Sequence, residues 1–180
     1  LAHRLGMWDV KWQLEDLAFR QLYAIAYEGI SKMLAVKRVE RESYVRKVVA
    51  ILSAELANEG IKAEVVGRPK HLYSIYQKMQ KYAEYGKEVG QIYDLYAVRV
   101  LVQELQECYG ALGIVHQLWH PLSGQFDDYI ASPKENMYQS LHTAVMCVEN
   151  APLEIQIRTY EMHQVAEYGV ASHWRYKTKL

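Results

Sequence analysis

The pentapeptide EIQIR, residues 154–158, alternates polar and apolar side chains at every step. Successive side chains of a β-strand point to opposite faces, so Glu154, Gln156 and Arg158 share one face. The two isoleucines between them share the other face and are expected in the core. Such alternation is most common in a strand whose polar face meets solvent and has no chemical role. A carboxylate, an amide and a guanidinium in one row also suit a binding site, and the pentapeptide alone leaves both interpretations open.

The rest of the chain predicts an α+β fold with a mixed β-sheet flanked by helices. Predicted helices span residues 8–29, 33–57, 69–82, 105–118 and a last segment after the N-cap Thr159; predicted strands span 61–66, 91–102, 139–148 and 152–158. Residues 119–137 have few periodic apolar side chains and are expected to form one long loop. The predicted organisation is a helical prefix, residues 1–57, followed by a main domain, residues 58–180.

Composition restricts the classes of function. The 180 residues carry 21 basic and 21 acidic side chains, so net charge gives no reason to expect nucleic acid or an anionic membrane as partner. Cys108 and Cys147 are isolated, which argues against a disulfide framework or structural zinc and fits a cytoplasmic location. The chain opens LAHRLGMW, without an initiating Met, and is interpreted as a piece of a longer protein.

The segment GRPKHLYSIYQKM, residues 67–79, is a candidate anion site. At helical spacing Lys70, Ser74 and Lys78 lie on one face, close to the positive end of the helix dipole. Arg68, just before them, is able to bind phosphate or stack on a flat base. A solvated polar face would have a similar pattern, but this one holds no compensating acidic residue.

Two acidic residues are candidates for binding a metal. Asp94 lies within the β-rich run QIYDLYAVRVLV, where an unpaired carboxylate is costly to bury. Mg²⁺ takes one or two protein carboxylates and fills its other positions with phosphate and water, so Asp94 and Glu154 form a possible metal pair. Glu154 would otherwise be a general base. Arg99, five residues after Asp94, could line the same site. It is an equally good interpretation that Asp94 only ends a strand and that Arg99 is an unrelated surface residue.

The segment 123–143 supplies a further set of polar and aromatic side chains. These are Lys134, Asn136, Tyr138, Gln139 and His142. A tyrosine at the mouth of a strand offers a stacking surface for a purine, and amides are able to read its edges. Ordinary packing is the alternative for Tyr138, because the chain has 15 tyrosines. His142 is more often a structural histidine than a catalytic one.

Taken in order, four segments resemble one family closely: GRPKHLYSIYQKM, YDLYAVRV, YIASPKENMYQSLHTAV and LEIQIRTYEMHQVAEYGVASHWRYK. They are similar to the synthetase domain of RelA/SpoT homologues, which make guanosine tetra- and pentaphosphate. The similarity covers roughly residues 60–177, and residues 1–20 resemble the end of that family's hydrolase domain and its linker. It implies a nucleotidyltransferase-like fold and transfer of pyrophosphate from ATP to the 3′-hydroxyl of GDP or GTP.

The resemblance also implies roles for individual residues. Arg68 and Arg99 would sandwich adenine; Lys70, Ser74 and Lys78 would hold the ATP phosphates. Asp94 would bind Mg²⁺, and Glu154 would help to hold the metal or activate the 3′-oxygen of the acceptor. Tyr138 would stack on guanine, surrounded by Lys134, Asn136, Gln139 and His142, while Gln156 and Arg158 support Glu154.

Some features depart from the family pattern. Relatives carry either a basic or an acidic version of the four residues before YIA. Here these residues, 125–128, are closer to the acidic version, but Gln125 stands in place of its first acid, which leaves the preference between GDP and GTP open. Met137 stands where relatives have glycine. The His-Asp motif of the hydrolase is absent, so hydrolysis is not expected. The alternative function is a nucleotide-binding regulatory domain whose synthesis is inactive or autoinhibited. Ribosome association of the parent protein is expected to depend on other segments.

Overall fold

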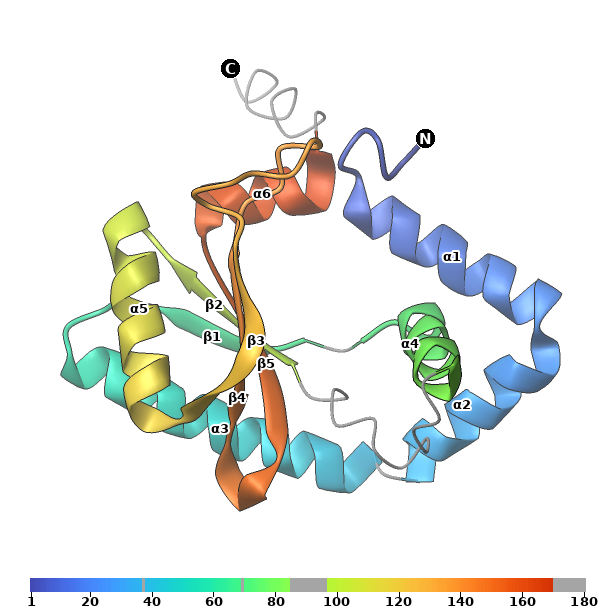
Figure 1. Cartoon of the computed structure of the whole chain (residues 1–180), viewed down its shortest axis with the longest axis horizontal. Helices are drawn as coiled ribbons and strands as arrows, with labels where there is room; N and C mark the ends of the chain where they lie inside the picture. The colour runs from blue at the N-terminus through green and yellow to red at the C-terminus, as the bar shows by residue number, and fades with distance from the viewer. Residues whose placement is uncertain (37, 69, 85–96, 170–180) are drawn as a thin grey trace.

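The computed structural model describes residues 1–36, 38–68, 70–84 and 97–169, and its centre is a five-stranded mixed sheet (Figure 1). The strands are β1 (Glu64–Gly67), β2 (Ala97–Val102), β3 (His120–Asp128), β4 (Leu141–Met146) and β5 (Pro152–Thr159). Their order across the sheet is β1-β2-β5-β4-β3. β2 and β5 are parallel, and the other neighbours are antiparallel. The strand that carries EIQIR is therefore the central one, with a partner on each side.

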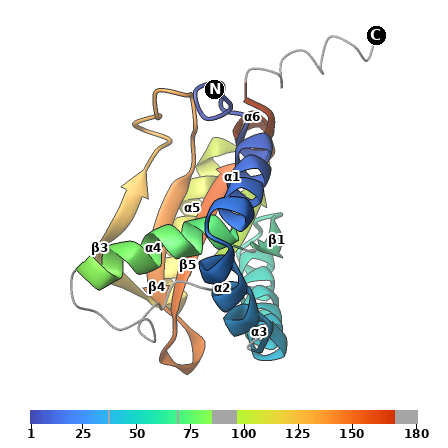
Figure 2. The same ribbon diagram turned by 90° about the vertical axis from the view of Figure 1, so that its right-hand side faces the viewer.

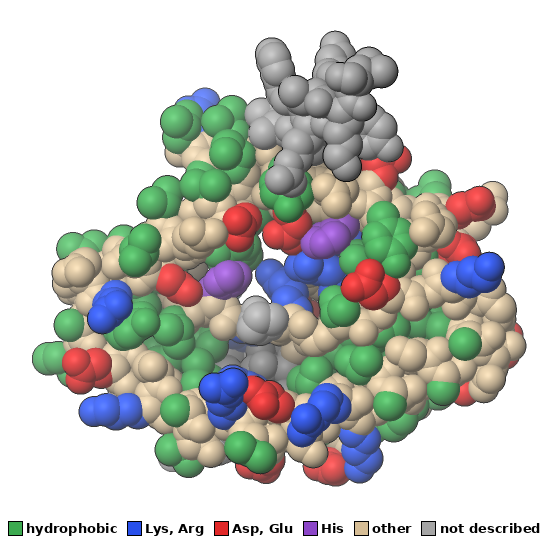
Figure 3. Space-filling model, turned by 180° about the vertical axis from the view of Figure 1, so that it is seen from behind, with side chains coloured by type: hydrophobic (Ala, Val, Ile, Leu, Met, Phe, Trp, Pro, Cys, Tyr) green, Lys and Arg blue, Asp and Glu red, His purple; other side chains and the backbone are tan. Residues whose placement is uncertain are grey.

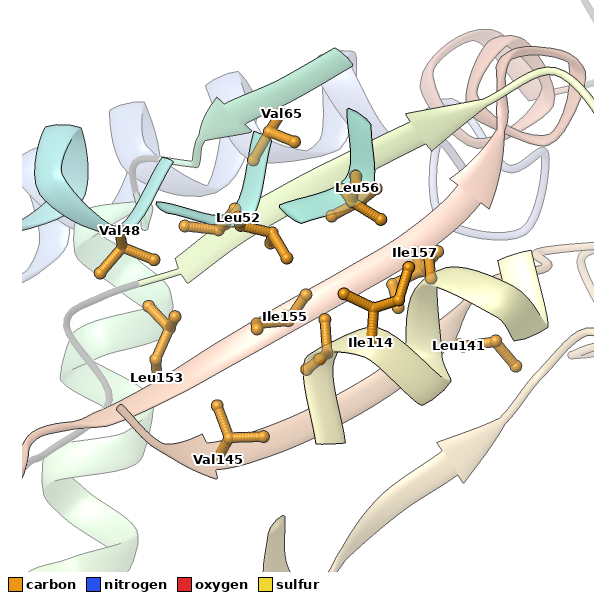
Figure 4. Packing of buried hydrophobic residues seen from close by; sticks show 14 of the residues in the cluster. Val48, Leu52, Leu56, Val65, Ile114, Leu141, Val145, Leu153, Ile155 and Ile157 are labelled. Carbon is orange, nitrogen blue, oxygen red and sulfur yellow. The ribbon is translucent and has the colours of Figure 1, made fainter. Parts of the chain in front are cut away.

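One face of the sheet packs against two helices and forms the main core. The helices of the chain are α1 (Trp8–Leu22), α2 (Ala24–Val36), α3 (Arg38–Asn58), α4 (Leu72–Glu84), α5 (Leu105–Leu118) and α6 (Tyr160–Tyr168), with a 3-10 turn, η2 (Val148–Asn150). α3 supplies Val48, Leu52 and Leu56 to the core, and α5 supplies Ile114 (Figure 4). Ile155 of β5 lies among them with no exposed surface. The predicted core face of EIQIR is confirmed.

The helices α1, α2 and α4 form a second, smaller apolar cluster. Phe19 of α1, Ile30 of α2 and Ile75 of α4 are buried together, and several tyrosine rings lie around Phe19 at tilted or T-shaped angles. α1 and α2 follow an arc from the neighbourhood of α6 to that of α3, with α4 inside it (Figures 1 and 2). Because α3 packs on the sheet and α1 packs on α4, helices of the predicted prefix contact the main domain directly.

The α+β class, the mixed sheet and the flanking helices are confirmed, while several predicted boundaries are wrong. Residues 120–128 are a strand, not part of a loop; β3 is an exposed edge strand, so it lacks the apolar alternation that marks a buried one. The predicted helix 8–29 is two helices, interrupted at Tyr23. α4 begins at Leu72, so Lys70 precedes the helix.

Other expectations are confirmed at the ends of elements. The side chain of Thr159 accepts a hydrogen bond from Met162 N at 3.1 Å, as expected of the N-cap of the last helix. α3 ends before Gly60, whose φ of 78° is one that glycine adopts without strain. Within the described ranges, no helix has the length and apolar character needed to cross a membrane.

Candidate active site

The second face of the sheet brings polar side chains of three strands into one row. Arg99 of β2 is in register with Gln156 of β5, and Gln156 with His142 of β4. The next pairs along β5 place Glu154 opposite Ala97 and Ala144. Gln156 and Arg158 are 3% and 1% exposed, so this face is not solvated, and the interpretation of EIQIR as an ordinary exposed face is wrong.

Glu154 is held by two hydrogen-bond donors and one further cation. Lys70 Nζ donates to its Oε2 at 2.9 Å, Gln156 Nε2 donates to its Oε1 at 2.8 Å, and Arg68 Nη1 lies 3.8 Å from Oε1. Burial raises the pKa of the Glu154 carboxyl, but the Lys70 ammonium and its hydrogen bond, with Arg68 and Gln156, outweigh it and lower the pKa to about 2. Glu154 is therefore a carboxylate at any physiological pH.

Lys78 lies in the same electrostatic environment. Burial lowers the pKa of its ammonium, and the charge of Lys70 lowers it further, to about 8, although Glu154 acts in the opposite direction. Ser74 is half-buried one turn earlier on the same helix. Lys70, on the segment before α4 and beside the Glu154 carboxylate, thus lies within electrostatic reach of Lys78, while the place of Ser74 in the predicted row stays a prediction.

A cavity of about 160 Å³ opens beside Glu154, between the sheet, α6 and α1. Its lining residues are Trp8, Trp12, Arg68, Arg99, Lys134, Tyr138, His142, Gln156, Arg158, Ala166 and Glu167. Figure 3 shows a hollow near the middle of one face, with Lys, Arg and His side chains at its edge. The excess of positive side chains makes the cavity suited to an anionic ligand with flat groups.

Tyr138 and His142 form one wall of the cavity. Their Oη and Nε2 atoms are hydrogen-bonded at 2.8 Å, and Lys134 Nζ lies 4.0 Å from the ring centroid of Tyr129 and 5.5 Å from that of Tyr138. Burial lowers the pKa of His142 to about 4, with Lys134 and two arginines contributing, so its imidazole is neutral. This wall offers aromatic surface next to a cation.

Two of the site residues predicted in the segment 123–143 brace the loop and do not line the cavity. Asn136 Oδ1 accepts a hydrogen bond from Tyr138 N at 3.3 Å, and Gln139 Nε2 donates to Ile130 O at 3.3 Å. Met137, between them, has a φ of 62°, in the left-handed region that favours glycine. The structure therefore gives a physical reason for the glycine expected at this position in relatives.

Four further residues of the cavity, Trp8, Trp12, Ala166 and Glu167, were not predicted as site residues. Glu167 contacts both Arg99 and Arg158, at 3.3 and 3.2 Å. Trp8 and Trp12 extend from α1 into the cavity; the Trp12 ring stacks on His71 at 4.2 Å between centroids, and that of Trp8 lies 6.0 Å from Tyr138. The i, i+4 spacing of the tryptophans on α1 is the one signal that the sequence gives for them, and it is equally typical of core packing.

Asp94 lies outside the described residues, so its distance from Glu154 stays a prediction. In the part of the chain that the structure describes, no group of three or more His, Cys, Asp or Glu side chains is arranged to hold a metal ion. An ionised carboxylate such as Glu154 is nonetheless a hard oxygen donor of the kind that Mg²⁺ prefers, and Mg²⁺ often takes only one or two carboxylates. The donor chemistry therefore fits magnesium.

Comparisons with known proteins agree with this geometry. Residues 67–180 match the family model described as the region found in RelA / SpoT proteins. The bifunctional (p)ppGpp synthase/hydrolase RelA of Mycobacterium tuberculosis is 52% identical over 98% of the chain, and the GTP pyrophosphokinase of Escherichia coli K12 is 50% identical over 98%. The chain spans only 24% and 23% of those two proteins.

Solved structures show the same fold. Small alarmone synthetase 2 from Bacillus subtilis has a TM-score of 0.56 and 26% identity, over 83% of this chain and 81% of that one. Small alarmone synthetase 1 from the same organism, bound to its product pppGpp, has a TM-score of 0.57 and 24% identity, over 83% of each chain. The fold is therefore that of the alarmone synthetases, and with the family match over residues 67–180, the chain belongs to the RelA/SpoT family.

Proposed function

We propose that the chain transfers the pyrophosphate of ATP to the 3′-hydroxyl of GDP or GTP, releasing AMP. The observation that carries the proposal is the Glu154 carboxylate held at 2.9 Å from Lys70, at the edge of a cationic cavity with aromatic walls. The relatives at about 50% identity named GTP pyrophosphokinase support the same reaction. In it, the 3′-oxygen attacks the β-phosphorus of ATP, the bond between the β-phosphorus and the AMP oxygen breaks, and the proton of the 3′-hydroxyl is released to solvent.

The chain's own cations would hold ATP. Lys70 and Lys78 neutralise the phosphate oxygens, and Ser74 donates a hydrogen bond to them. Arg68, which directly follows β1, and Arg99 of the neighbouring strand β2 line one cavity, so an adenine ring between them would meet a guanidinium on each face. Phosphoryl-type transfer requires mainly alignment and neutralisation of charge, and this arrangement supplies both.

The low pKa of Glu154 favours one of its two expected roles. A carboxyl with a pKa of about 2 is a weak base, so Glu154 acts through its negative charge more than by taking the proton of the 3′-hydroxyl. Glu154, with Asp94, would hold Mg²⁺, which when bound neutralises charge on the phosphate oxygens and on the leaving AMP. When ATP binds, Lys70 must then break its hydrogen bond with Glu154 and bind a phosphate oxygen instead.

The acceptor nucleotide would bind on the Tyr138 wall. Guanine stacks on the Tyr138 ring, and Lys134 supplies charge to the 5′-phosphates beside it. His142, neutral and hydrogen-bonded to Tyr138, orients that ring. Asn136 and Gln139 act indirectly, by fixing the loop that carries Tyr138.

The test is an incubation of the chain with ATP, Mg²⁺ and either GDP or GTP, with the nucleotides resolved by anion-exchange chromatography. AMP and a 3′-pyrophosphorylated guanosine nucleotide are expected in equal amounts, and Glu154→Gln should abolish both. The matched control is Glu149→Gln on the exposed η2 turn, which removes a surface carboxylate and should leave the yield unchanged. Product formed by a folded Glu154→Gln variant at the wild-type rate would refute the assignment.

A second candidate function, a nucleotide-binding regulatory domain with synthesis held off, is favoured by the position of α1. Trp8 and Trp12 occupy the wall of a cavity of about 160 Å³. Ligand sites are usually about 300–1,000 Å³, and the reaction needs two nucleotides. Binding of ATP without product formation, reversed by removing the tryptophan side chains, would identify this state.

The expected setting of the reaction follows from its substrates. ATP and guanine nucleotides are cytoplasmic metabolites, so we place the enzyme in the cytoplasm. The proposal includes no direct contact of this chain with nucleic acid or membrane, and any association of the whole protein with the ribosome is assigned to other segments.

A further inference from the structure

The last turn of α6 places one carboxylate between two guanidinium groups. Glu167 Oε1 lies 3.3 Å from Arg99 Nη1 and accepts a hydrogen bond from Arg158 Nη2 at 3.2 Å. Arg99 comes from β2 and Arg158 from β5, and the two strands are parallel neighbours. A single side chain of α6 thus connects the two strands over the candidate site.

Both arginines depend on this carboxylate. The Arg158 side chain is 2% exposed and that of Arg99 16% exposed, and neither Nε atom has a hydrogen-bond partner. Burial, and after it the charge of Arg158, lower the pKa of Arg99 to about 10, and Glu167 opposes both effects. Among the described residues, Glu167 is the carboxylate that pairs with either arginine. Two adjacent buried cations repel each other and stay in place only while a counter-charge lies between them.

His163, one turn earlier on α6, cannot take over this role. Burial lowers its pKa to about 4, with Arg158 and Arg99 contributing, so the imidazole is neutral. The Nδ1 atom of His163 accepts a hydrogen bond from Arg158 Nη2 at 2.8 Å. Nδ1 also lies 3.5 Å from Glu167 Oε1, but both of these atoms are acceptors of Arg158 Nη2, so this contact is not an ion pair.

We infer that Glu167 is the positioning residue of the adenine subsite: it holds the guanidinium of Arg99 in the cavity that Arg99 shares with Arg68, where a flat base would lie between the two. The inference rests on the proposed function, since it assigns Arg99 to the base of ATP. Without Glu167, Arg99 turns away from Arg158 toward solvent, and the subsite loses one of its two stacking surfaces while the phosphate-binding lysines stay in place.

Base-dependent binding separates this role from a merely structural one. The dissociation constants of ATP and of inorganic tripolyphosphate are measured by titration calorimetry on the whole chain, wild type and Glu167→Gln. The amide keeps the size of the side chain and removes its charge. ATP should bind about tenfold more weakly, and tripolyphosphate, which has no base, should bind unchanged. The matched control is Glu161→Gln, which removes an exposed carboxylate from the first turn of the same helix and should change neither constant.

A double-mutant cycle tests whether Glu167 acts through Arg99. In an Arg99→Ala background, Glu167→Gln should have no further effect on ATP binding, because the guanidinium that stacks on adenine is already absent. Additive losses would overturn the inference, as would equal weakening of ATP and tripolyphosphate. If the Gln variant does not fold, Glu167→Asp is used: its retracted carboxylate should weaken ATP binding to an intermediate extent, and unchanged binding would overturn the inference. Wild-type chain that binds no ATP would instead refute the proposed function.

Discussion

The activity of the wild-type chain should decrease at alkaline pH because Lys78 loses its proton. Its pKa is lowered to about 8, first by burial and then by the charge of Lys70. The charged fraction of a group with this pKa falls from about 90% at pH 7 to about 10% at pH 9. If only the ammonium form binds the ATP phosphates, kcat/KM for ATP should fall about tenfold over this interval, since kcat/KM reports the pKa values of the enzyme form that ATP meets.

The Lys78→Arg variant provides the control. A guanidinium keeps its charge throughout this range, so kcat/KM for the variant should stay nearly constant between about pH 7 and pH 9, whatever its absolute value. ATP is varied at a saturating concentration of GDP, and the ratio of wild type to variant is plotted, which cancels the ionisation of the substrates. A wild-type profile that is flat to about pH 9, or a parallel decrease in both proteins, would refute the reasoning.

Three further substitutions test the remaining parts of the account. Ile155→Ala, at a fully buried position of the central strand, should lower the free energy of unfolding by about 2–5 kcal/mol in a urea titration, and a loss below about 1 kcal/mol would contradict the assigned core. Met137→Gly should raise the urea midpoint. The left-handed region costs an L-residue about 1–2 kcal/mol, whereas the greater backbone entropy that glycine loses on folding costs only about 0.5–1 kcal/mol, so removing the strain outweighs the added entropy cost. A lower midpoint would show that no such strain exists. Trp12→Ala should increase the rate of product formation if α1 holds synthesis off, whereas the exposed neighbour Gln13→Ala should not. An unchanged rate in Trp12→Ala would contradict this role of α1, and a lower rate would argue that the indole helps to bind substrate.

The central strand was predictable from sequence because its two faces have different environments. Ile155 and Ile157 enter a packed core, so the alternation of EIQIR has a direct physical cause. The N-cap role of Thr159 was also predictable, since capping depends on neighbours along the chain. β3 was missed because it is an edge strand: Phe126 is 47% exposed, and nothing requires its residues to alternate.

The arrangement of the site depends on contacts between distant segments. That Lys70 and Glu154 are hydrogen-bonded follows from the strand order β1-β2-β5, which local patterns do not reveal. Glu167 was not assigned a role because its carboxylate has meaning only beside Arg99 and Arg158, on other elements. The family resemblance, carried by long motifs, connected these residues to one reaction before their geometry was known. The division into residues 1–57 and 58–180 stays a prediction.

The most direct measurement follows the β-phosphorus of ATP. The chain is incubated with Mg²⁺, GDP and ATP that carries a radioactive phosphate at the β position, and the labelled nucleotides are separated. Because pyrophosphate transfer breaks the bond between the α- and β-phosphates, the label should appear in the guanosine product, and the AMP that accumulates should carry none. Label that stays in ADP, or in unreacted ATP after long incubation with every substrate present, would contradict the account.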